Sequence, residues 1–149
     1  MTINLETALA WMKNREGKVS YSMAYRDGED SYDCSSSIYY ALRSGGAASA
    51  GWAVNTEYEH QWLIDNGFEL ISENTTWDAQ RGDIFIWGRK GASAGAGGHT
   101  GIFVDSDNII HCNYAYDGIS VNNYDERWYY SGQPYYYAYR YTGASEAQP

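Results

Sequence analysis

The 149-residue chain is poor in cysteine, in proline and in basic side chains. It has 2 cysteines and 2 prolines, and its 10 lysines and arginines face 19 aspartates and glutamates, for a formal net charge of −9. Two cysteines are too few for a disulfide framework. Such an acidic chain is a poor partner for nucleic acid, and residues 1–11 lack the continuous apolar run of a secretory signal or a membrane span. We therefore expect a protein made in the cytoplasm that binds neither nucleic acid nor membrane.

Tyrosine and glycine are abundant, with 16 of each against 3 phenylalanines. Tyrosine suits half-hydrated clefts as well as protein cores, because its ring is apolar and its hydroxyl is polar. A chain of this length can bury a core of its own without metals or disulfides. We expect one domain over residues 1–142, followed at residues 143–149 by the start of a linker.

Apolar residues at helical spacing predict three helices in the first half of the chain. The first covers residues 4–15, with Asn4 or Thr2 as its cap and Gly17 at its end. The second begins at Cys34 and ends at Gly45-Gly46. For the third helix, Thr56 and Glu59 have the spacing of a capping box, and Asn66-Gly67 ends it.

After residue 67 the apolar pattern changes to a period of two, which is typical of strands. Helices first and strands afterwards predict an antiparallel sheet with helices packed on one side, an α+β domain. The glycine-rich segment 91–98 is expected to form a mobile flap immediately before His99. The predicted strands are residues 68–71, 83–87, 99–104, 108–112 and 135–141.

Cys34 stands where a polar turn gives way to the second predicted helix. At that position the free backbone N–H groups and the helix dipole favour the thiolate, which is the reactive form of cysteine. A nucleophilic cysteine needs a base nearby. The chain offers three histidines, namely His60, His99 and His111.

His99 and His111 lie in two predicted strands joined through residues 105–107. If those residues form the turn, Val104 faces Asn108 and both histidines point to the same face. Cys112 must then point to the opposite, apolar face as a packing residue. A thiol, an imidazole and a second polar group that holds the imidazole are what acyl transfer requires.

At these residues the sequence resembles a known family, the NlpC-type papain-like cysteine peptidases and amidases of bacterial cell walls. The matching features are Tyr21, the triplet Asp33-Cys34-Ser35, the segment 98–103 (Gly-His-Thr-Gly-Ile-Phe) and His111. Over about residues 5–141, and especially in segments 31–37, 51–58 and 81–88, the chain is similar to the catalytic domains of phage endolysin amidases. It departs from these families at Ser36, where glycine is usual, and in lacking choline-binding repeats.

The resemblance implies a papain-like α+β fold in which the catalytic cysteine begins a helix packed on an antiparallel sheet, so that residues 1–142 are a cysteine amidase domain. It also implies hydrolysis of the bond between N-acetylmuramic acid and L-alanine in peptidoglycan, after release from the host cytoplasm, causing lysis. We expect a monomer that uses no cofactor and no metal. The implied roles are Cys34 as nucleophile, His99 as base, His111 as its orienter, Tyr21 and the Cys34 N–H at the oxyanion, and Ser35, Trp52 and Trp87 at the substrate.

Other hypotheses stay open on the residues alone. Related domains cut within the stem peptide after D-glutamate, and a non-catalytic wall-binding module would use its tyrosines to hold glycan. A zinc site is disfavoured, because strand alternation separates His111 from Cys112. We expect His60 to be a surface or interface histidine rather than a catalyst, and the run 135–141 to be a half-buried strand rather than a sugar-binding platform.

Overall fold

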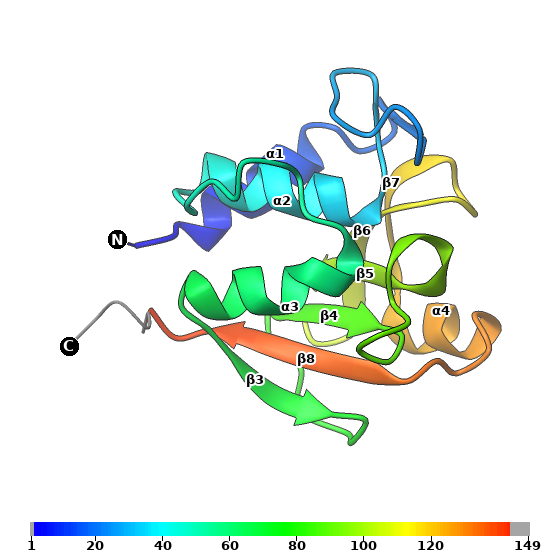
Figure 1. Cartoon of the computed structure of the whole chain (residues 1–149). Helices are drawn as coiled ribbons and strands as arrows, with labels where there is room; N and C mark the ends of the chain where they lie inside the picture. Colours follow the sequence, from blue (N-terminus) through cyan, green and yellow to red (C-terminus); the bar gives the residue numbers. More distant parts are fainter. Residues whose placement is uncertain (1, 144–149) are drawn as a thin grey trace.

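The computed structural model describes residues 2–143, in which four α-helices surround a six-stranded sheet (Figure 1). The strand order is β3-β8-β4-β5-β6-β7, and every neighbouring pair is antiparallel. The predicted α+β class and antiparallel sheet are confirmed. The strands of this sheet are β3 (Phe68–Glu73), β4 (Ile84–Trp87), β5 (His99–Phe103), β6 (Asn108–Asn113), β7 (Gly118–Asn123) and β8 (Tyr136–Tyr141).

The first two helices form where their caps and apolar spacing predict them. Helix α1 (Leu5–Lys13) is capped by Asn4, whose side chain accepts the N–H of Thr7. Helix α2 (Cys34–Ser44) ends at Gly45, where an added Cβ would lie 2.5 Å from the carbonyl oxygen of Asn4. This close approach packs the two helices side by side. Before α2, β1 (Ser20–Tyr21) and β2 (Ser31–Tyr32) form a short parallel pair.

The third helix corrects one predicted cap. Helix α3 (Thr56–Asp65) is capped by Asn55, whose side chain accepts the N–H of Tyr58. Thr56 is therefore the first helical residue and Glu59 is not part of a capping box. Both side chains turn instead toward the start of α2 and strand β5, where they take part in the site described below.

The hairpin of β5 and β6 has the predicted register. Ile102 pairs with Ile110 and Phe103 with Ile109, and the N–H of Val104 donates to the carbonyl oxygen of Asn108. Cys112 is fully buried in the apolar core. Its predicted role as a packing residue is confirmed.

The sheet has two covered faces, whereas helices on one side were predicted. Helices α1, α2 and α3 pack over the face that carries Ile84, Ile102 and Ile110 (Figure 1). On the other face a second, aromatic cluster contains Phe85, Trp87, Phe103, Ile109 and Tyr136. Tyr124 and Trp128 of helix α4 (Tyr124–Tyr130) pack against it. Neither β7 nor α4 was predicted, and both matter for the site.

Two further expectations are corrected. His60 is only 4% exposed, and its Nδ1 is hydrogen-bonded to the hydroxyl of Tyr139 at 2.6 Å, so it is a core histidine rather than a surface or interface one. The glycine-rich segment contains a 3-10 turn (Gly95–Gly97). The Glu57 carboxylate accepts the N–H groups of Gly91 and Ser93, so the first half of the segment is tied down.

No helix within residues 2–143 has both the length and the apolar character needed to cross a membrane. Of the predicted linker, residues 144–149 lie outside the described part of the chain.

Candidate active site

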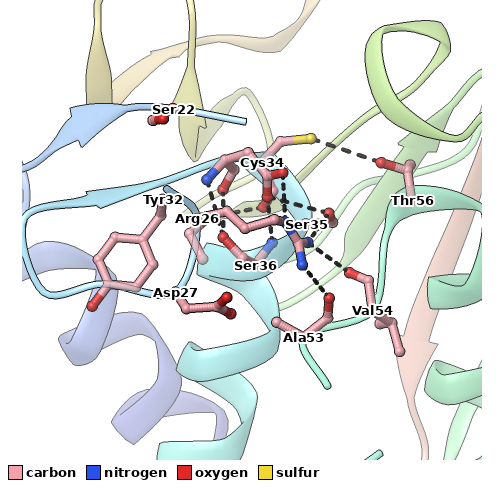
Figure 2. A network of polar contacts seen from close by, with 12 residues as sticks. Ser22, Arg26, Asp27, Tyr32, Cys34, Ser35, Ser36, Ala53, Val54 and Thr56 are labelled. Carbon is pink, nitrogen blue, oxygen red and sulfur yellow. Dashed lines mark hydrogen bonds and ion pairs between the residues drawn. The ribbon is translucent and has the colours of Figure 1, made fainter. Parts of the chain in front are cut away.

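Cys34 is the first residue of α2, and its side chain is 5% exposed. Asp33 caps the helix by accepting the N–H of Ser36, and the Ser36 hydroxyl in turn accepts the N–H of Asp33. This reciprocal pair fixes the backbone at the cysteine. Figure 2 shows the sulfur atom turned toward Thr56, whose Oγ1 lies 3.8 Å from it. The Asp-Cys-Ser motif therefore forms the start of helix α2 and fixes the position of the Cys34 thiol.

Arg26 ties this helix start to the chain that leads into α3 (Figure 2). Its Nε donates to Asp33 at 2.8 Å, and its Nη2 donates to the Ser35 hydroxyl at 3.0 Å. The same guanidinium donates to the carbonyl oxygens of Ala53 and Val54. One planar side chain thus fixes Cys34 and Thr56 relative to each other. The sequence gives no local signal for this link, because Ala53 and Val54 are far from Arg26 along the chain.

The Cys34 thiol is protonated in this environment. Burial, followed by the negative charge of Asp33, raises its pKa to about 12. Hydrogen bonds from Thr56 and from the Thr100 backbone act in the opposite direction but are weaker. The helix-start effect expected from the sequence is therefore overridden by desolvation. Activation of this thiol requires a base.

Glu59 is fully buried near the thiol, and its surroundings favour the protonated carboxyl group. The Thr100 hydroxyl lies 2.8 Å from the carbonyl oxygen of Phe85 and 2.7 Å from Oε2 of Glu59. Its one hydrogen is therefore shared between two acceptors unless the carboxyl group is protonated and donates to Thr100. Burial likewise raises the pKa of Glu59 well above its ordinary value. A neutral Glu59 spares the Cys34 thiolate a nearby negative charge.

The two strand histidines are hydrogen-bonded to each other. His99 Nε2 and His111 Nδ1 are 2.8 Å apart. Gly101 makes this possible, since a Cβ there would lie 2.8 Å from Cβ of His111 and from the ring of Phe85. The ring of His99 also packs beside Trp87, at 5.2 Å between centroids. The second glycine of the Gly-His-x-Gly motif is therefore needed because a side chain at that position would collide with His111.

A chain of hydrogen bonds from β7 sets the proton positions of both histidines. Asn113 is oriented by backbone groups and donates from Nδ2 to the Ser120 hydroxyl at 2.9 Å. Ser120 must then donate to Oδ1 of Asn122, at 2.6 Å. That oxygen also accepts from His111 Nε2, at 2.9 Å.

His111 therefore carries its hydrogen on Nε2 and accepts at Nδ1 from His99 Nε2–H. Within residues 2–143, Nδ1 of neutral His99 then has no hydrogen-bond partner and is free to accept a proton. Burial, followed by the charge of the neighbouring histidine, lowers the pKa of His99 well below its usual value. Burial also lowers the pKa of His111 to about 4, although the bond to Asn122 opposes this shift. Both imidazoles are neutral at neutral pH.

A cavity of about 280 Å³ opens beside the histidines. Tyr21 and Trp87 line it together with His99 and His111, so the structure brings four of the seven predicted side chains together. Burial, followed by the charge of a Cys34 thiolate, raises the pKa of Tyr21 to about 12, which keeps its hydroxyl protonated as a donor. The remaining lining residues are Asn113, Tyr114, Ala115, Arg127 and Ser131.

The other three predicted residues lie elsewhere. Cys34 does not line this cavity. Its thiol contacts the backbone N–H of Thr100, the residue that follows His99, and within residues 2–143 no hydrogen bond joins it to His99. Ser35 is buried and bonded to Arg26. Trp52 is 47% exposed and packs edge-on against Tyr58 at the surface. The sequence reading missed Arg26, Glu59 and Asn122, whose partners only the fold reveals.

Comparison with known proteins gives a consistent picture. A family model described as bacteriophage peptidoglycan hydrolase matches residues 4–148. The lysin of Pneumococcus phage Dp-1 is 77% identical over 149 residues, which are the whole of this chain and 50% of that protein. The chain thus spans half the length of this curated relative.

Among solved structures, NlpC1 of Trichomonas vaginalis aligns with a TM-score of 0.65 at 18% identity, over 95% of this chain and 45% of that one. The NlpC/p60 domain of the peptidoglycan hydrolase SagA aligns with a TM-score of 0.56 at 21% identity, over 91% of this chain and 97% of that one. These likenesses concern the fold, and they confirm the predicted papain-like NlpC type.

Proposed function

The chain belongs to the family of bacteriophage peptidoglycan hydrolases, and on this premise we propose that it cleaves the amide bond between N-acetylmuramic acid and L-alanine, with Cys34 as nucleophile. The observation that carries the proposal is the hydrogen-bonded line His99–His111–Asn122, which leaves Nδ1 of His99 free. His99 directly precedes Thr100, whose backbone N–H contacts the Cys34 thiol. The proposed site of action is the bacterial cell wall, reached from the host cytoplasm.

In the first step His99 Nδ1 takes the thiol proton while Cys34 Sγ attacks the lactyl carbonyl carbon. Because both groups are neutral at rest, proton transfer accompanies the attack rather than preceding it. The thiol must leave Thr56 and meet His99 when substrate binds, and such contacts commonly tighten only in the complex. His111 and Asn122 hold the imidazole and stabilise the positive charge that it gains.

The carbonyl oxygen becomes an oxyanion as the C–S bond forms. The N–H of Cys34 lies in the first turn of α2, where N–H groups have no intrahelical acceptor. Together with the Tyr21 hydroxyl it supplies two donors, each worth about 3 kcal/mol in comparable sites.

In the second step the C–N bond breaks and His99 returns its proton to the leaving amino group of L-alanine. Cys34 is then acylated as a thioester. A water molecule gives one proton to His99 and attacks the thioester carbonyl, which releases the muramoyl carboxylate and restores the thiol. No external oxidant or cofactor enters this balance.

Mass spectrometry of digested peptidoglycan tests the scissile bond. New amino ends on L-alanine are expected, whereas stems cut after D-glutamate would replace the amidase by an endopeptidase. The Cys34→Ala variant tests the class of protein: we expect it to keep the fold and lose hydrolysis. A wall-binding module would keep its full effect on cell walls after that substitution.

A further inference from the structure

The cavity beside the histidines contains one permanent charge. His99 and His111 are neutral at neutral pH, and the Tyr21 hydroxyl is protonated, for the reasons given above. Of the residues that line the cavity, only Arg127 is always ionised. The cavity wall is thus singly positive, although the whole chain has a net charge of −9.

The guanidinium of Arg127 has no acceptor within residues 2–143. The structure gives it two aromatic neighbours, Tyr116 at 5.5 Å and Tyr130 at 5.7 Å from ring centroid to guanidinium carbon, but no hydrogen bond or ion pair. By contrast, Arg26 and Arg140 each hold a buried aspartate. A half-buried charge without a partner is costly unless a ligand supplies one.

The position of Arg127 is coupled to the histidine line. Strand β7 carries Asn122, which holds His111, and helix α4 follows directly with Asn123 as its cap. Arg127 is in the last turn of that short helix, close enough for its charge to lower the pKa of His111. The continuous segment of β7 and α4 therefore positions both the His111 imidazole and the Arg127 guanidinium beside the same cavity.

We propose that Arg127 is a specificity residue that binds a carboxylate of the stem peptide beside the scissile bond. The inference rests on the proposed function and names the substrate feature that the site reads. The planar guanidinium presents paired N–H donors that match a carboxylate. A carboxamide offers one acceptor oxygen and no charge, so it is the poorer ligand. Because the chain as a whole has a net charge of −9, the cavity selects a single local carboxylate and not an extended polyanion.

Two synthetic muramoyl tripeptides test the inference, differing only in whether the α-carboxyl group of the D-glutamyl residue is free or amidated. We expect the full chain to hydrolyse the free acid with a kcat/KM about tenfold or more above that of the amide, mainly through KM. Arg127→Met should abolish this preference, because kcat/KM for the free acid falls toward that for the amide. Arg127→Lys should restore part of it.

Arg89→Met is the matched control, because Arg89 is exposed, stacks on Tyr135 at 4.0 Å and does not line the cavity. It should keep the preference. Calorimetry measures the affinity of both tripeptides for Cys34→Ala, which cuts no bond. This affinity tests the contact with Arg127 separately from the proposed chemistry. Equal affinity for the two tripeptides, or an undiminished preference in Arg127→Met, would overturn the role of Arg127.

Discussion

The two halves of the candidate site are built differently. Around Cys34 the polar groups are buried and paired with one another: Arg26 binds Asp33, and Glu59 binds Thr100. The histidine half is instead a line of groups from three strands that ends in an unpaired nitrogen of His99 and an open cavity. The difference teaches that the thiol side is built for stability and the imidazole side for reaction. Substitutions of the paired groups around Cys34 should therefore change folding, and substitutions in the histidine half should change activity.

The largest expected effect is on the histidine side. His99→Ala removes the only base that the proposed chemistry uses, so we expect hydrolysis of peptidoglycan to fall by about a thousandfold or more while the melting temperature hardly changes. Release of soluble wall fragments measures the rate. The control is His60→Gln, a core substitution far from the cavity, which should cost stability and leave the rate near that of the wild type. Comparable rates for His99→Ala and the wild type would remove His99 from the mechanism.

On the thiol side, Arg26→Met leaves the carboxylate of Asp33 without its partner at the start of α2. Because the two side chains are 18% and 12% exposed, we expect a loss of about 3 kcal/mol in the free energy of unfolding. Urea denaturation measures it. Arg81→Met breaks a pair with Glu6 whose side chains are 50% and 69% exposed, and it should cost less than about 1 kcal/mol. Equal losses in the two variants would show that Arg26 does not anchor the site.

Glu59 gives the thiol side a characteristic pH dependence. Its folded pKa is raised, so the folded chain keeps a proton that the unfolded chain loses above a pH of about 4.3. Stability should therefore fall as pH rises through that window, by up to about 1.4 kcal/mol per pH unit from this group. Glu59→Gln cannot titrate, so its stability relative to the wild type should grow from pH 5 to pH 8. Parallel pH profiles of unfolding would mean that Glu59 is ionised in the fold.

The smallest expected effect concerns Asn122. In Asn122→Asp a carboxylate accepts from His111, which favours the charged imidazole and moves the acidic limb of the kcat/KM profile upward by about one pH unit. Asn123→Asp is the control, because Asn123 only caps α4 through the N–H of Glu126 and aspartate caps equally well. A purely structural Asn122 would lower activity without moving the limb.

Much of the fold follows from local patterns. The caps and apolar spacing of α1 and α2 and the turn at residues 105–107 are short-range features, and each matches the structure. Strand β7 was not predicted, because asparagines such as Asn122 and Asn123 are typical of turns. In the structure Asn122 orients His111, and Asn123 caps α4. The cap of α3 was misassigned because Asn55 and Thr56 are both good caps, and only packing against Cys34 decides between them.

The site was only partly predictable for the same physical reason. Cys34, His99 and His111 lie in motifs, and strand alternation puts both histidines on one face. The raised pKa of Cys34 could not be foreseen, because it depends chiefly on burial, which only the packing of the folded chain decides. Trp52 and Ser35 show the converse error, since a suitable residue type near a motif need not reach the cavity.

Acid-quenched mass spectrometry during turnover tests the central claim, that the thiol and the free imidazole nitrogen act together on peptidoglycan. With a soluble muramoyl peptide, we expect a muramoyl thioester on Cys34 in the wild type, and neither adduct nor product in Cys34→Ala. His99→Ala should likewise accumulate no adduct, because the thiol cannot be deprotonated. Continued hydrolysis by Cys34→Ala, with no acylated cysteine in the wild type, would contradict the proposed mechanism.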